Sequence, residues 1–129
     1  MILADTSAWI EYLRRTGSPE NLRVRGLLDA GELAVTDVVI MEVLAGAFDA
    51  LHRRRLRRLL GSCEYVPTLA PHDYEAAADL SRTCRHAGLT IRAIADCLVA
   101  AVAIRAGAAV LHADRDFDSI AHHAPLKLD

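Results

Sequence analysis

The sequence predicts a single α/β domain in which a short parallel sheet is flanked by helices. Short apolar segments alternate with longer helical segments along the chain, a pattern typical of parallel sheets with helices on both faces. The length of 129 residues suits one domain, residues 1–129, and we see no linker, repeat or low-complexity segment within it. Hydrophobic residues make up 53% of the chain, which is enough for a core that needs no disulfide bonds.

Capping residues indicate where the helices of the first half begin. Thr6 and Thr36 are expected to cap the first and third helices, and Ser18 precedes Pro19 at the start of the second. Gly31 ends the second helix. We therefore expect strands at 2–4, 33–35 and 64–66, and helices at about 6–15, 19–30, 37–47 and 51–60.

Glycines mark the ends of two long helices in the second half. Gly88 follows a helix expected at 72–86, and Gly107 follows one expected from Thr90 to Ala106. A strand at 108–111, a short helix at 117–121 and an edge strand at 126–128 complete the expected fold.

Four acidic residues occupy unusual positions in this pattern. Asp5 directly follows the first strand, and Asp114 follows the strand at 108–111. Glu42 and Asp96 lie on helical segments that are otherwise almost entirely apolar. Each has a local explanation: Asp5 and Asp114 can cap a helix, Asp96 is favoured near a helix start, and Glu42 can be partly exposed.

Together, these acids favour a metal site. In parallel sheets the active site lies beyond the carboxyl ends of the strands, where acids from strand ends and helices can converge. Clustered carboxylates raise one another's pKa unless a cation neutralises them. Oxygen ligands without paired His or Cys favour Mg²⁺ or Mn²⁺, and such ions commonly act on phosphates.

Four segments, in order, resemble the PIN domain of VapC-type toxins from bacterial toxin–antitoxin pairs: MILADTSAWIEYLR, TDVVIMEVLAGA, ADCLVAAVAIRAG and VLHADRDFDSIA. The resemblance implies an α/β/α sandwich and a Mg²⁺- or Mn²⁺-dependent endoribonuclease acting on structured RNA such as tRNA. It also implies a homodimer with a VapB-like antitoxin as partner. A cytoplasmic location is expected from the residues themselves, because three cysteines without a CxxC motif suit a reducing compartment. Ala4 departs from the pattern, in which a larger β-branched residue is usual.

The resemblance also implies a set of acidic catalytic residues: Asp5, Glu42, Asp96, Asp114 and Asp116. We expect Asp5, Asp96 and Asp114 to bind the metal, while Glu42 and Asp116 bind a second ion or orient water. Thr6 matches a supporting hydroxyl position. Whether one metal or two are held stays open, because a carboxylate can bridge ions or merely orient water.

Basic residues are candidates for RNA contacts. Arg92 and Arg115 lie near the acids in sequence and are the first candidates. The arginine-rich segment HRRRLRRLL (52–60) fits either phosphate contacts or a solvated helix face. Ser7 has no base beside it in sequence and is interpreted as polar packing at a helix start.

Other classes of protein fit the sequence less well. Phosphotransfer domains with acids at strand ends usually need a nearby lysine, and the only lysine here is Lys127, in the tail. No glycine-rich loop follows a strand, which excludes nucleotide-binding folds of the Rossmann or P-loop type. The remaining alternative is a catalytically silent PIN fold that only binds RNA or protein. Loss of acids would signal that alternative, and all the acids are present.

Overall fold

The computed structural model describes residues 1–129 and contains five strands and seven helices. In chain order they are β1 (Ile2–Ala4), α1 (Thr6–Leu13), α2 (Pro19–Ala30), β2 (Leu33–Thr36), α3 (Asp37–Ala45), α4 (Ala50–Gly61), β3 (Glu64–Val66), α5 (His72–His86), α6 (Ile94–Ala106), β4 (Ala109–Leu111), α7 (Asp116–Ala121) and β5 (Lys127–Leu128). None of the helices combines the length and the apolar character that a bilayer crossing requires.

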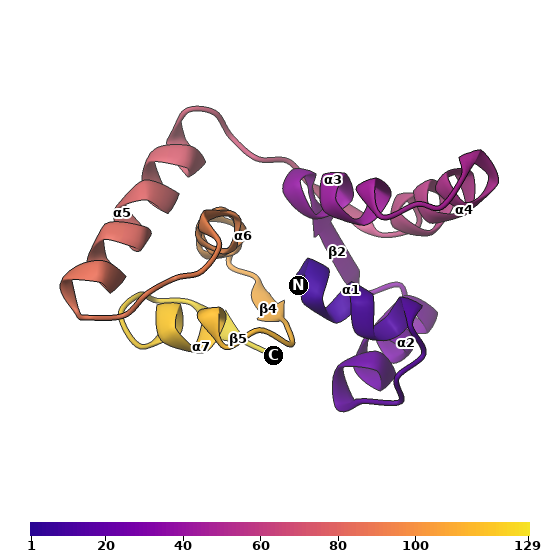
Figure 1. The fold of residues 1–129 in the computed structure, drawn as a ribbon, viewed down its shortest axis with the longest axis horizontal. Coiled ribbons are helices and arrows are strands. Elements are labelled where there is room, and N and C mark those ends of the chain that lie inside the picture. The colour runs from indigo at the N-terminus through magenta and orange to yellow at the C-terminus, as the bar shows by residue number, and fades with distance from the viewer.

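The five strands form one parallel sheet in the order β3-β2-β1-β4-β5. The chain moves outward from β1 to β3 and then returns to β4 on the other side of β1. Right-handed crossovers therefore place α1–α4 on one face of the sheet and α5–α7 on the other, as Figure 1 shows. This three-layer arrangement confirms the predicted α/β fold.

Helix α6 is the most buried helix of the fold. It lies between α5 and the sheet, and in Figure 1 it is viewed almost along its axis. Its second and third turns consist of buried small and β-branched side chains, including Val99, Ala100, Val102 and Ala103. A helix that is apolar on all sides must be covered on all sides. The first turn is buried on one side only: Ile94 is exposed, whereas Asp96 is held in a poorly solvated environment.

Several helix caps and boundaries differ from the expectation. Helix α1 ends at Leu13 rather than at about Arg15, and the side chain of Thr36 forms no cap hydrogen bond at the start of α3. Asp5, and not Thr6, caps α1, because its side chain accepts the Ser7 N–H. Helix α3 ends at Ala45, two residues earlier than expected. Helix α6 starts at Ile94 rather than Thr90, because Ala93 is extended.

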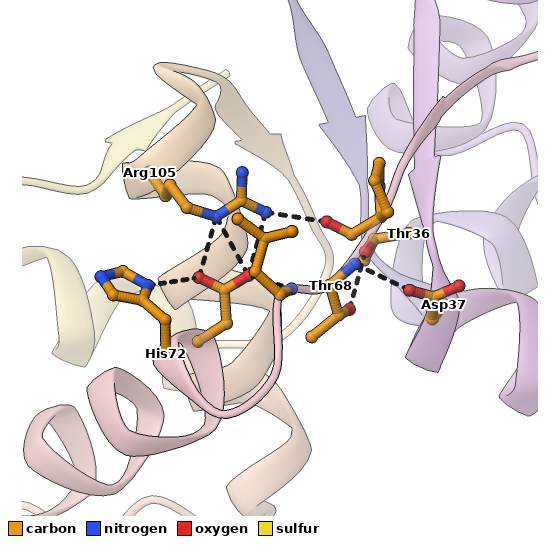
Figure 2. Close-up of polar contacts among 8 residues, drawn as sticks. Thr36, Asp37, Thr68, His72 and Arg105 are labelled. Carbon is orange, nitrogen blue, oxygen red and sulfur yellow. Dashed lines mark hydrogen bonds and ion pairs between the residues drawn. The ribbon is translucent and has the colours of Figure 1, made fainter.

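A buried ion pair joins α5 to α6. Asp73, fully buried in the first turn of α5, accepts two hydrogen bonds at 2.9 and 3.0 Å from Nε of Arg105, on the last turn of α6. Arg105 also donates to the carbonyl of Pro67 at 2.8 Å (Figure 2). Beside this pair, Asp37 accepts the Thr68 N–H and so ties the start of α3 to the same loop. The loop after β3 is thereby held to both faces of the fold.

Candidate active site

Asp5 lies at the carboxyl end of the central strand β1 and is 3% exposed. Ser7 donates to its Oδ2 twice, from the backbone N–H at 3.0 Å and from Oγ at 2.6 Å. Burial raises the pKa of Asp5, the Ser7 hydrogen bonds oppose that rise, and the nearby charge of Asp114 adds to it. Asp5 is therefore held rigidly, close to a second carboxylate.

Asp96 lies in the first turn of α6 and is 8% exposed. Its Oδ2 is fully buried and has no hydrogen-bond partner. Burial raises the pKa of Asp96 well above its usual range, and the adjacent Asp116 carboxylate and the charges of Asp5 and Asp114 raise it further. A buried carboxylate oxygen without a partner is costly, so this oxygen indicates that the site is completed by something positively charged.

The loop after β4 brings two more acids to Asp96. Carboxylate oxygens of Asp96, Asp114 and Asp116 all lie within 4.8 Å of one another. Oδ1 of Asp114 accepts the Asp116 N–H at 3.0 Å, which fixes the turn that carries both side chains. The sequence expectation grouped Asp5, and not Asp116, with Asp96 and Asp114. In the structure the tightest group contains Asp116.

Glu42 lies outside this group of three acids. It is exposed on α3, and its Oε1 accepts a hydrogen bond at 2.9 Å from Oγ1 of Thr6. The two side chains line the edge of a cavity of about 340 Å³ between α1, α3 and α4. Glu42 is thus oriented by Thr6 and is not part of the group of three carboxylates.

The two candidate RNA-binding arginines have different surroundings. Arg92 donates from Nη2 to Oδ1 of Asp114 at 2.8 Å, and its Nε lies 3.6 Å from Oδ1 of Asp116. Arg115 is exposed and forms no hydrogen bond or ion pair through its side chain. The structure therefore places Arg92 within the acidic cluster and leaves Arg115 at the surface.

These residues fit a hard divalent cation. The grouped ligands are carboxylate oxygens, with no Cys or His among them, and such sets favour Mg²⁺ or Mn²⁺. Clustered acids alone are common on protein surfaces, and the buried, unpartnered oxygen of Asp96 is a second, independent feature of this site that suits a cation.

Comparison with known proteins shows the family to which this chain belongs. The PIN-domain family model matches residues 2–123. Ribonuclease VapC11 of Mycobacterium tuberculosis is 46% identical over 123 residues, which are 94% of this chain and 92% of that protein. The chain belongs to the VapC family of PIN-domain proteins. Ribonuclease VapC51 of the same organism is 32% identical over 120 residues, which cover 92% of this chain and 84% of that protein.

Solved structures confirm the PIN fold. VapBC2 from Rickettsia felis, in complex with a DNA fragment from its promoter, matches with a TM-score of 0.76 at 17% identity. The match covers all of this chain and 98% of that one. At this level of identity the likeness shows the fold alone.

Sequence reasoning missed the role of Ser7 in this PIN domain. Ser7 was interpreted as polar packing at a helix start, yet its Oγ both donates to Asp5 and accepts the Ala113 N–H at 2.9 Å. It therefore connects the end of β1 to the loop that carries Asp114. The available signal was local: a serine two residues after a strand-end aspartate can close a turn with it.

Proposed function

We propose that this chain is a metal-dependent endoribonuclease and the toxin of a toxin–antitoxin pair. The observation that carries the proposal is the buried, unpartnered oxygen of Asp96 beside Asp114 and Asp116. Its setting in a VapC-family chain supports RNA as the substrate, since the relatives VapC11 and VapC51 are ribonucleases by name.

In this proposal, Asp96, Asp114 and Asp116 would hold Mg²⁺ or Mn²⁺, and Asp5, whose pKa is raised in part by the charge of Asp114, would complete the acidic site. The bound ion supplies Lewis-acid chemistry, which polarises a phosphate oxygen and makes water more acidic. Ser7 orients Asp5 through its two hydrogen bonds, which also oppose the rise in the pKa of Asp5 that burial causes. Glu42, oriented by Thr6, accepts a proton from the attacking water or directs it.

The proposal includes a substrate, an inhibitory partner and a cellular location. The substrate is a structured RNA with an exposed single-stranded loop, such as tRNA. The inhibitory partner is a VapB-like antitoxin, in keeping with the VapBC complexes among the structural neighbours. The toxin acts in the cytoplasm, where RNA is available, and does so as a homodimer.

The test is cleavage of a total-RNA pool by the purified protein with Mg²⁺, Mn²⁺ or EDTA. We expect metal-dependent cuts that Asp5→Asn and Asp96→Asn each reduce by at least about a hundredfold, because losing a ligand removes several kcal/mol of transition-state stabilisation. Sequencing of the new ends identifies the RNA and the cut site. Asp79→Asn, on the exposed surface of α5, is the control and should retain full activity.

Two results would contradict the proposal. If the wild type and both variants cut alike, the cuts come from a contaminating nuclease. If RNA binds but is not cut under any metal, the chain is the catalytically silent binding module that the sequence left as the alternative.

A further inference from the structure

Arg92 is the one basic side chain that reaches the acidic cluster. Its guanidinium forms a 2.8 Å hydrogen bond with Oδ1 of Asp114, and its Nε lies 3.6 Å from Oδ1 of Asp116. The guanidinium is therefore the group that offsets the negative charge of these carboxylates in the protein alone.

The backbone and the side chain of Arg92 are held in different ways. The backbone N–H donates to Oδ2 of Asp116 at 3.0 Å, which anchors the extended segment before α6. The side chain is 58% exposed and extends from this anchor over the cluster. The guanidinium can therefore leave the acids by side-chain rotation while the backbone stays in place.

The atom that Arg92 contacts is already shared. Oδ1 of Asp114 accepts both the guanidinium of Arg92 and the backbone N–H of Asp116. A divalent cation in the group of three carboxylates needs an oxygen of Asp114 as well. A guanidinium this close also repels any cation that enters. Two positive groups thus compete for one carboxylate.

We propose that Arg92 is a resident counter-ion of the acidic cluster, which competes with the divalent cation for Asp114 and is released when the cation binds. This inference rests on the proposed function, because it assumes that the cluster takes a metal. Once released, the guanidinium lies at the edge of the site, where its planar donors suit a phosphate group. In this account Arg92 acts on the metal site through Asp114.

The contact between Arg92 and Asp114 could also favour metal binding, and the two roles predict opposite changes in metal affinity. If Arg92 served only to hold Asp114 in a metal-binding orientation, removing its side chain would weaken metal binding. If it competes, removing the side chain strengthens metal binding. The sign of the change in metal affinity therefore separates the two roles.

The experiment is calorimetric titration of Mn²⁺ into the full-length protein for the wild type, Arg92→Gln, Arg92→Lys and Arg115→Gln. We expect Arg92→Gln to bind Mn²⁺ about threefold to tenfold more tightly, as suits the loss of a partly exposed ion pair. Arg92→Lys retains the charge and should stay closer to the wild type. Arg115→Gln is the matched control, because Arg115 is an exposed neighbour of the same acids without a contact to them.

Thermal unfolding gives a second readout, which is how the Tm difference between Arg92→Gln and the wild type depends on Mn²⁺. A purely structural role of Arg92 would lower Tm equally with and without Mn²⁺. In EDTA, Arg92→Gln should unfold at a lower temperature than the wild type, because the carboxylates have lost their counter-ion. With saturating Mn²⁺ this difference should shrink or vanish. A difference of equal size under both conditions, or Mn²⁺ binding that is unchanged or weaker in Arg92→Gln, overturns the inference and leaves the metal site standing. If the wild type binds no Mn²⁺ at all, the metal centre of the proposed function fails, and the inference fails with it.

Discussion

Asp96 combines burial with a carboxylate oxygen that no group in the protein satisfies. In the metal-free chain we expect Asp96→Asn to raise the free energy of unfolding by about 1 kcal/mol, or roughly 4 °C in Tm, because asparagine removes a carboxyl that must either bury its charge or take up a proton on folding. The asparagine amide can also donate to the neighbouring carboxylates of Asp114 and Asp116. Thermal unfolding in EDTA measures the effect.

The same substitution should abolish RNA cleavage, so stability and activity should change in opposite directions. The exposed Asp79→Asn variant should move Tm by no more than about 2 °C. If Asp96→Asn instead destabilises the metal-free chain, the Asp96 carboxylate has favourable contacts in that state. Its buried oxygen would then no longer support a cation site.

At the level of residues, the acids were predictable because each conflicts with its local pattern. Asp96 and Glu42 interrupt apolar helices, and Asp5 ends a buried strand. Of the partners of these acids, Ser7 lies two residues from Asp5 and carried a local signal. The contact of Arg92 with Asp114 spans 22 positions, and that of Ser7 with the Ala113 N–H spans 106, so no local pattern predicts either of them.

Between elements, the Asp73–Arg105 pair that joins α5 to α6 should make stability depend on acid. Burial alone would raise the pKa of Asp73, but the hydrogen bonds from Arg105, from the Leu69 N–H and from His72 outweigh it and lower the pKa to about 2. Because the folded pKa lies below the unfolded value of 3.8, the unfolded chain binds more protons between these pH values. Ionised Asp73 therefore contributes about 2 kcal/mol to the free energy of unfolding. This contribution is complete above about pH 4 and is lost as the pH falls through about 2.

Urea unfolding at a series of pH values from 7 to 2 tests this. The wild type should lose stability below pH 4, whereas Asp73→Asn should start less stable at pH 7 and show a smaller further loss. Asp29→Asn, on the exposed side of α2, is the matched control and should follow the wild type. Parallel pH profiles for the wild type and Asp73→Asn would show that the pair does not carry the acid sensitivity.

The boundaries of elements were predictable where a local signal decides them. Ser18 caps α2 as expected, and Gly31 and Gly107 end their helices in the left-handed conformation. The start of α6 was wrong by four residues because a tertiary contact decides it. Ala93 is extended and so interrupts a helix from Thr90, and the Arg92 N–H donates to Asp116, 24 positions further along the chain, which holds the segment before α6.

On the scale of the whole molecule, alternation of strands and helices predicted the layers but not the order of the strands. The order β3-β2-β1-β4-β5 places β4 beside β1 although more than a hundred residues separate them. That pairing brings the loop with Asp114 and Asp116 next to Asp5. The site therefore depends on the pairing of β1 with β4, with acids from the end of β1, from α6 and from the segment after β4.

Because its ligands come from such distant segments, metal binding should stabilise the molecule as a whole. The unfolded chain cannot hold these carboxylates together, so a cation that binds only the folded state adds about 2.7 kcal/mol at a concentration one hundred times its Kd. We expect Tm to rise by roughly 10 °C at that Mn²⁺ concentration and to fall back when EDTA is added. Asp96→Asn should show little of this rise, whereas Asp79→Asn should show all of it. If Asp96→Asn and the wild type respond equally to Mn²⁺, the ion binds elsewhere on the chain, and the cluster around Asp96 is not the metal centre.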